Sequence, residues 1–385
     1  MAKCIVWWAC LSLLSLGGCS SSDSGSGGAG GMAGSGGDGG NPGARLVVTA
    51  DWLNQSLTLL DYDKLVDGQS DAEASIIGEI DLSDWGPGPV EVEITPDGKT
   101  AVVSVGPAFF DTLPGLVGDP EIPAGGTLLI VDLESGQADE VQTEDVPLGI
   151  AISPDGTTAY TANYGTSDAR GDSLSIIDIA GRRVIEEVNV GSGPEQVALS
   201  ADGSLGIVNV VSGRGVRLFE TADVAGTLSD VVETGSDPSD VSFLDGNDRA
   251  VAANSFTFDV TLLDTSDPSS PRALNSTLLG TGVPYGVTYV PARDAILAPA
   301  AATGTDLPTY LVTFTRDADT LNPSAPLEMP GDNFPLTATA DSAGDFAFVA
   351  HIVDHKLSII ELETGDTRSI EWLTESGPSY VAVQP

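Results

Sequence analysis

The chain has 385 residues, and its formal net charge of −41 arises from 56 Asp and Glu against 15 Lys and Arg. A surface of this sign repels phosphate backbones and anionic headgroups, which excludes nucleic acid as a partner. Short runs of Val, Ile, Leu and Thr alternate with 46 Gly and 24 Pro, so the composition indicates one large all-β repeat domain.

The N-terminal residues are typical of an export signal. Lys3 precedes an apolar run over residues 4–16, which is too short to span a bilayer as a helix. The following Leu-Gly-Gly-Cys at residues 16–19 resembles the lipobox of bacterial lipoproteins. The resemblance implies that Cys19 is acylated and becomes the new N-terminus. Because no Asp follows Cys19, it also implies the outer membrane as destination. An ordinary cleaved signal peptide is the alternative.

Residues 20–43 contain eleven Gly and six Ser and no Lys, Arg or aromatic residue. Such a segment cannot bury a core and is expected to be a flexible tether. The predicted organisation is a signal peptide over residues 1–18, a lipidated cysteine and tether over 19–43, and a propeller domain over 44–385. All three cysteines lie within residues 4–19, so the domain has no disulfide framework and no thiol-based metal site.

Residues 44–385 repeat one unit of a proline, a short strand, an Asp-Gly turn, a second strand and a third strand. We call the recurring proline the lead proline, and the seven copies are Pro89, Pro147, Pro194, Pro238, Pro284, Pro335 and Pro378. Spacings of 43 to 58 residues suit a four-stranded propeller blade. Asp and Gly tolerate the dihedral angles of a tight hairpin, which explains the recurring Asp-Gly pairs.

The two ends of the repeat region complete each other. The last copy stops after one strand at residues 380–383, whereas the first copy begins with strands at 46–50 and 57–61 and lacks that strand. Pairing of the C-terminal strand with the N-terminal strands closes a ring without an open sheet edge. The sequence therefore predicts an all-β, seven-bladed β-propeller with four antiparallel strands in each blade.

The copy over residues 153–178 carries Ser-Pro-Asp-Gly, then Ala-Tyr-Thr-Ala-Asn, then Ser-Ile-Ile-Asp. This pattern resembles the YVTN-repeat family of β-propellers. Propellers similar to that family occur as surface-layer and envelope proteins and as lactonase-like enzymes, so the resemblance implies a fold more than a function.

The lead prolines and the loops after the second strands are expected at one face of the ring, which we call the proline face. The Asp-Gly turns are expected at the opposite face, which we call the turn face. Insertions at 106–125, 164–172 and 299–308 all belong to the proline face, and loops on a rigid scaffold often carry binding sites. Candidate residues in the loops of the proline face are Phe109, Phe110, Tyr164 and Arg170 within the insertions, and Arg214 in another loop of this face.

A polar residue ends the second strand in five copies: Asp51, Asn163, Asn209, Asn254 and His351. One hypothesis is a polar rim for a ligand around the channel mouth. The alternative is that these side chains, Asn above all, hydrogen-bond to nearby backbone. His351 and His355 are the only histidines, and they flank Asp354. One hypothesis is a metal-binding or catalytic role for them, and the alternative is that both are simply exposed in a polar loop.

No nucleophile elbow, phosphate-binding loop or His-Glu-x-x-His zinc motif is present. The preferred hypothesis is an envelope-anchored, monomeric binding module for a surface protein or small ligand, attached to the membrane through its lipid only, without a cofactor or metal site. One alternative is a lactonase-like hydrolase, whose relatives use acidic, basic and His groups on one face. Another is binding of Ca²⁺ or a similar cation by acidic loops.

Overall fold

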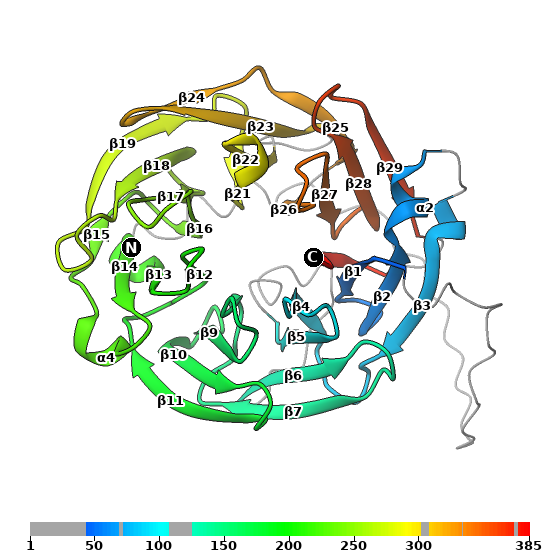
Figure 1. The fold of residues 1–385 in the computed structure, drawn as a ribbon, viewed down its shortest axis with the longest axis horizontal. Helices are drawn as coiled ribbons and strands as arrows, with labels where there is room; N and C mark the ends of the chain where they lie inside the picture. Colours follow the sequence, from blue (N-terminus) through cyan, green and yellow to red (C-terminus); the bar gives the residue numbers. More distant parts are fainter. Residues whose placement is uncertain (1–43, 69–71, 108–124, 302–307, 333, 373–375) are drawn as a thin grey trace.

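The computed structural model describes residues 44–68, 72–107, 125–301, 308–332, 334–372 and 376–385. These residues form seven antiparallel sheets that are arranged radially around a central axis (Figure 1). The prediction of a seven-bladed β-propeller with four strands in each blade is confirmed.

Six blades have four single strands, which follow one another from the axis to the rim. Blade 1 contains β30 (Pro378–Val383), β1 (Leu46–Asp51), β2 (Ser56–Asp61) and β3 (Ile76–Asp81). Blade 2 contains β4 (Pro89–Ile94), β5 (Thr100–Val105), β6 (Gly126–Asp132) and β7 (Ala138–Thr143). Blade 3 contains β8 (Ile150–Ile152), β9 (Thr158–Gly165), β10 (Arg170–Asp178) and β11 (Arg183–Asn189). Blade 4 contains β12 (Val197–Leu199), β13 (Leu205–Val210), β14 (Gly215–Glu220) and β15 (Val232–Glu233).

Blade 5 contains β16 (Pro238–Phe243), β17 (Arg249–Asn254), β18 (Asp259–Asp264) and β19 (Arg272–Leu278). Blade 7 contains β26 (Pro335–Ala340), β27 (Phe346–His351), β28 (Lys356–Glu361) and β29 (Thr367–Glu371). Short helical segments are α2 (Tyr62–Val66), η1 (Ala72–Ser75), η3 (Val211–Gly213), α4 (Val224–Thr227) and η4 (Pro291–Arg293). Across the described ranges, we find no helix with the length and apolarity that a membrane span requires.

Blade 6 contains the least regular copy of the repeat, around Pro284. Its innermost position is shared by β20 (Val283–Pro284) and β21 (Thr288–Val290), which both pair with β22 (Ala295–Ala301). The next strand is β23 (Pro308–Asp317), and β24 (Thr320–Pro323) and β25 (Leu327–Asp332) share the rim. This blade is therefore complete, with its first and last strands each divided in two.

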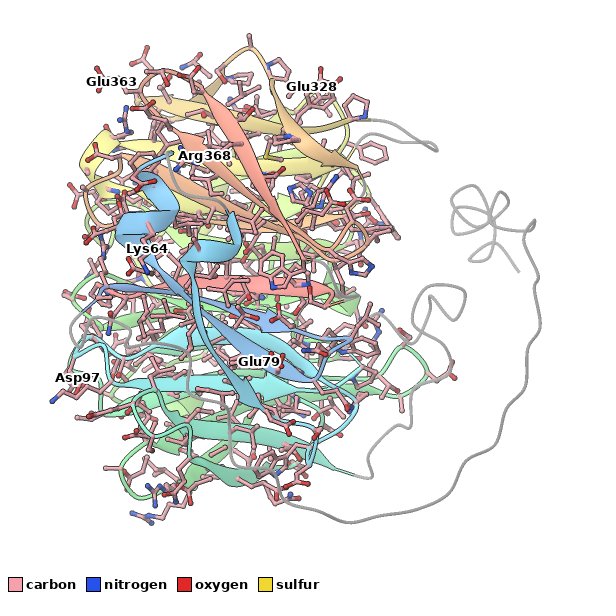
Figure 2. All side chains as sticks on the ribbon, turned by 90° about the vertical axis from the view of Figure 1, so that its right-hand side faces the viewer. Lys64, Glu79, Asp97, Glu328, Glu363 and Arg368 are labelled. Carbon is pink, nitrogen blue, oxygen red and sulfur yellow. The ribbon has the colours of Figure 1, made fainter. Side chains whose placement is uncertain are left out.

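The Asp-Gly turns join the first and second strands and lie at one face of the disc, as the position of Asp97 in Figure 2 illustrates. Gly156 has a φ of +73°, which a residue with a side chain rarely adopts. The Asp155 carboxylate accepts hydrogen bonds from the Ser153 hydroxyl and the Thr157 amide, at 2.7 and 3.0 Å. The recurring motif thus fixes the hairpin that leads each chain segment away from the axis.

Seven of the eight clusters of buried apolar residues in the described ranges lie between neighbouring blades, one at each contact. Between blades 3 and 4, for example, fully buried Ala162 and Leu174 pack with Val208 and Phe219. No blade can bury both of its faces alone, so stability depends on closure of the whole ring.

Closure is made by the C-terminal strand, as predicted. β30 pairs with β1 in antiparallel register, with Val47 opposite Val383 and Asp51 opposite Pro378. In Figure 1 the red C-terminal strand lies beside the blue N-terminal strands in the same blade. Blade 1 also contacts blade 7 through the Tyr62 hydroxyl, which donates to the Asp341 carboxylate.

Candidate functional site

The second residue after each lead proline lies on the innermost strand or just before it, and together these residues form one level around the axis. We call this level the channel ring, and its members are Glu91, Gly149, Gln196, Asp240, Gly286, Thr337 and Tyr380. Glu91, Gln196, Asp240 and Tyr380 line two cavities at once. The ring therefore divides the central channel into a chamber toward the turn face and a chamber toward the proline face.

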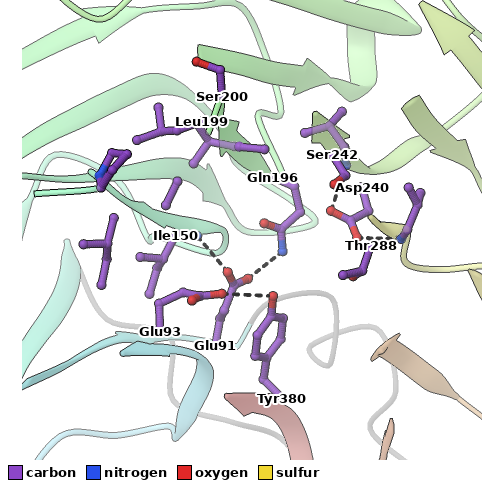
Figure 3. Close-up of a pocket in the computed structure, with 17 residues that line it drawn as sticks. Glu91, Glu93, Ile150, Gln196, Leu199, Ser200, Asp240, Ser242, Thr288 and Tyr380 are labelled. Atoms are coloured by element: carbon purple, nitrogen blue, oxygen red, sulfur yellow. Dashed lines mark hydrogen bonds between the residues drawn. The ribbon is translucent and has the colours of Figure 1, made fainter. Parts of the chain in front are cut away.

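The wide chamber has a volume of about 350 Å³ and extends from the channel ring to Pro154 and Ser200 beside the turns. This volume lies at the lower end of the range of small-molecule sites, roughly 300–1,000 Å³. Figure 3 shows Glu91, Glu93 and Tyr380 on one side of it. Asp240, Ser242 and Thr288 lie on the other side.

The narrow chamber, toward the proline face, has a volume of about 50 Å³. Its walls include Leu148, Leu336 and Tyr285. Leu148 also belongs to an apolar cluster with Trp52 and Ile352, which packs at the proline face. This half of the channel is largely filled by side chains, so the wide chamber is the better candidate for a ligand.

Glu91 connects three blades through its carboxyl group. Its two oxygens accept hydrogen bonds from the Ile150 amide of blade 3 at 2.9 Å and the Gln196 side chain of blade 4 at 2.5 Å. Burial, reinforced by the neighbouring Glu93, raises the pKa of Glu91 well above its ordinary value. Glu91 therefore holds a proton more readily than an ordinary glutamate.

Glu93 and Tyr380 face each other in the wide chamber, where the Tyr380 hydroxyl donates to Glu93 Oε1 at 3.5 Å. Burial raises the pKa of Glu93 to about 7, and the charge of Asp240 acts in the same direction. Burial and the nearby Glu91 and Glu93 raise the pKa of the Tyr380 phenol well above its ordinary value. Both side chains are only partly buried because they reach into the channel.

Asp240 accepts the Val287 amide of blade 6 at 2.8 Å, and burial raises its pKa to about 7. The glycines of the channel ring make room for its polar members. A Cβ at Gly149 would lie 2.2 Å from the Gln196 side-chain oxygen, and a Cβ at Gly286 would lie 2.6 Å from the Leu336 carbonyl oxygen. The wide chamber thus contains two carboxyl groups, Glu93 and Asp240, that are half ionised near neutral pH, beside Glu91, whose pKa is also raised.

The five polar residues at the ends of the second strands are all fully buried: Asp51, Asn163, Asn209, Asn254 and His351. Their partners differ from blade to blade. Asn209 accepts two backbone amides of its own blade and donates to the Pro238 carbonyl of blade 5. His351 pairs with the Ser358 hydroxyl at 2.8 Å, and burial lowers its pKa to about 4. These side chains lie between strands rather than along the open channel.

Other predicted site residues lie at the proline face. The Arg170 guanidinium stacks on the Tyr164 ring, with 4.2 Å from its carbon to the ring centre. Arg214 is exposed in a left-handed turn, and His355 Nδ1 accepts the Gly377 amide at 3.1 Å. Cys19, Phe109 and Phe110 are outside the described residues. Within the described part of the chain, no three His, Cys, Asp or Glu side chains are placed to hold a metal ion.

The channel residues were not among the sequence candidates, although a signal for them exists. Aligned on the lead proline, the second following residue is Glu91, Gln196, Asp240 or Tyr380 in four copies. An acidic or amide side chain on the innermost strand cannot reach the outer surface of the protein, so we expect it to face the central axis.

The buried carboxyl groups predict an unusual dependence of stability on pH. Asp51, Glu93 and Asp240 have folded pKa values of about 7, above their ordinary values, so the folded state binds more protons between about pH 4 and 7. Stability therefore falls as pH rises through this window. His351, with its lowered pKa of about 4, acts in the opposite direction but is a single group. Turn aspartates such as Asp202, whose pKa is lowered, titrate below this pH window.

We therefore expect a melting temperature several degrees higher at about pH 5 than at about pH 8, measured by calorimetry. The Asp51→Asn variant should show a smaller difference because the amide cannot titrate. A melting temperature that rises steadily between these two pH values would contradict the expectation.

No family model matches the sequence, and no curated protein matches it. Solved structures do share its fold. A periplasmic gluconolactonase of Pseudomonas aeruginosa superimposes with a TM-score of 0.68 at 15% identity, covering 89% of this chain and 99% of the other. A putative 6-phosphogluconolactonase of Bacteroides fragilis gives 0.64 at 13% identity, covering 90% and 99%. The hydrazine synthase of Kuenenia stuttgartiensis gives 0.61 at 18%, covering 78% and 90%. The fold thus has lactonase-like structural neighbours.

Proposed function

We propose that the wide chamber is an acid–base site that hydrolyses a small lactone. The observation that carries this proposal is the placement of Glu91, Glu93 and Asp240, with Tyr380, around one cavity of about 350 Å³. General acid–base catalysis is most effective when the pKa of the catalytic group lies near the working pH. The pKa values of Glu93 and Asp240, about 7, meet that condition.

In the proposed reaction, ionised Glu93 removes a proton from a water molecule while the oxygen of that water attacks the lactone carbonyl carbon. The ring carbon–oxygen bond then breaks, and the leaving oxygen takes up the proton that Glu93 removed from the water, which returns Glu93 to its ionised form. Tyr380 stays protonated at neutral pH because its pKa is raised, so its hydroxyl can donate to oxygen atoms that gain negative charge. Asp240 lies on the other side of the chamber and supplies a second group that can hold a proton.

The charge of the chamber favours product release. Hydrolysis converts a neutral lactone into a hydroxy acid that is anionic at neutral pH. The negative product then lies among carboxyl groups, and like charges repel more strongly in a partly buried site. The structural neighbours that are named a gluconolactonase and putative 6-phosphogluconolactonases support the choice of a sugar lactone as first substrate.

The test is hydrolysis of glucono-1,5-lactone by the purified full-length protein, followed by acid release and compared with the spontaneous rate. Acceleration that saturates with substrate supports the proposal. If a panel of sugar and short aliphatic lactones shows no acceleration by the folded protein, the proposed activity is wrong.

A second candidate function is binding of another envelope component at the proline face. An exposed apolar patch favours it, formed by Phe256, Phe258 and Leu278 with exposed fractions of 43%, 40% and 66%. The Leu279 amide donates to the Phe258 carbonyl at 3.1 Å, so these segments of blade 5 are adjacent. Apolar surface of this kind on an otherwise acidic protein is typical of a contact site. Cross-linking in intact cells, lost when both phenylalanines become serine, would support this function.

We also propose that acylation at Cys19 holds the propeller at the cell envelope, at the outer membrane. Acyl chains contribute roughly 0.8 kcal/mol per buried methylene, so several chains on one cysteine give a stable anchor. Cys19→Ser should abolish incorporation of labelled palmitate and move the protein from the membrane to the soluble fraction. Cys10→Ser is the matched control and should change neither. Palmitate labelling that persists in Cys19→Ser would contradict the anchor.

A further inference from the structure

The channel surrounds the proposed site with acidic groups and offers no basic counterpart. The wide chamber contains Glu91, Glu93 and Asp240, and the narrow chamber adds Glu195. Among the described residues that line either chamber, none is Lys, Arg or His. Arg170 acts electrostatically on Glu195 and Asp237 from the proline face but does not line either chamber.

The same walls carry hydrogen-bonding groups suited to hydroxyls. Ser242, Thr288, Gln196 and Tyr380 line the wide chamber. Thr337, on the channel ring, is buried at 8% exposure and lines the narrow chamber, with its hydroxyl beside the Tyr380 phenol.

From the cavity, its carboxyl groups without a basic partner and the hydroxyl and amide groups of its walls, we propose that the channel binds a small polyhydroxylated molecule that carries a protonated amine. This inference names the ligand class of the site and rests on the proposed function only for its location. A buried carboxylate without a counter-charge is unfavourable, and a ligand ammonium group supplies that charge. A phosphate group among the same carboxylates adds repulsion instead. Amino sugars and amino polyols are therefore favoured over neutral sugars, and phosphorylated sugars are excluded.

The experiment compares three probes of one size, D-glucosamine, D-glucose and D-glucose 6-phosphate, by titration calorimetry with the full-length protein at neutral pH and low salt. We expect D-glucosamine to bind at least about tenfold more tightly than D-glucose, with no detectable binding of the phosphate ester. Tighter or equal binding of D-glucose 6-phosphate, equal affinity for the amine and the neutral sugar, or no binding of any probe overturns the inference.

Two variants assign the preference to the channel. Asp240→Asn keeps an oxygen that accepts the Val287 amide and loses only the acceptor of the adjacent Val241 amide, and Glu93→Gln keeps an oxygen that accepts the Tyr380 hydroxyl, so both should fold. Each should bring the affinities for D-glucosamine and D-glucose within about threefold of each other, whereas Glu363→Gln at the exposed outer surface should not. An undiminished preference in both folded channel variants contradicts this assignment.

Lactone hydrolysis is measured on the same preparation. Hydrolysis without an amine preference overturns the ligand class and leaves the proposed function standing. An amine preference without hydrolysis supports the ligand class and overturns the proposed lactone hydrolysis.

Discussion

Replacing Glu93 by Gln should lower kcat/KM for lactone hydrolysis by about 10²–10⁴-fold, the usual contribution of a general base. Gln has the size of Glu and can still accept the Tyr380 hydroxyl, but it cannot take a proton from water. The loss should therefore appear mainly in kcat, with KM little changed. Initial rates over a range of lactone concentrations, corrected for spontaneous hydrolysis, measure both constants.

The pH dependence gives an independent check on this role. Ionised Glu93 is the active form, and its pKa is about 7, so kcat/KM of the wild-type protein should rise with pH through a midpoint near that value. The remaining activity of the Gln variant should lack this step. Glu363→Gln, an exposed carboxylate outside the channel, should match the wild type. Full activity of Glu93→Gln, or an unchanged pH profile, would exclude Glu93 as the base.

The architecture could be predicted from the sequence because each blade repeats the same local chemistry. Lead prolines, Asp-Gly turns such as Asp155 and Gly156, and alternating apolar residues recur at a spacing that only a blade satisfies. The missing strand at one end and the extra strand at the other predicted closure by β30. The division of both the first and last strands of blade 6 was not predictable, because its copy of the motif is degenerate.

The site was harder to predict because polarity alone does not separate buried structural groups from groups that line a cavity. Asn209 and Asp240 are both polar residues near strand ends. Asn209 is fully buried between blades, whereas Asp240 faces the channel. The two environments differ because Asn209 lies on the second strand of its blade, whereas Asp240 lies on the first strand, next to the axis. A prediction that places each polar residue by strand and by side of the pleat would have identified the channel ring.

Deleting residues 378–385, which contain β30, should prevent the domain from folding. The strand supplies fully buried Val381 to the contact between blades 7 and 1, and Ala382 to the contact between blades 1 and 2. The Ser379 hydroxyl also bonds the Ala50 carbonyl within the blade and the Val90 carbonyl of blade 2. Burial of Val381 alone contributes roughly 1.5–3 kcal/mol, and loss of the strand also exposes the apolar faces of blades 1, 2 and 7 that it covers, so the loss is a large part of the stability of a domain, about 5–15 kcal/mol. Loss of the β-sheet circular dichroism signal and of a cooperative melt would show this.

A circular permutation separates the role of the strand from the role of its position in the chain. Because Val383 lies opposite Val47, residue 385 can be joined to residue 44 through a turn of about two or three residues. New ends between β29 and β30 then make blade 1 continuous in sequence. This permuted chain should fold and melt within a few degrees of the parent, since every inter-blade contact remains. If the truncated chain melted cooperatively at the parent temperature, closure by β30 would not be what stabilises the ring. If instead both altered chains failed to fold, the order of the chain itself would matter, because the non-covalent junction inside blade 1 would be needed for the ring to assemble.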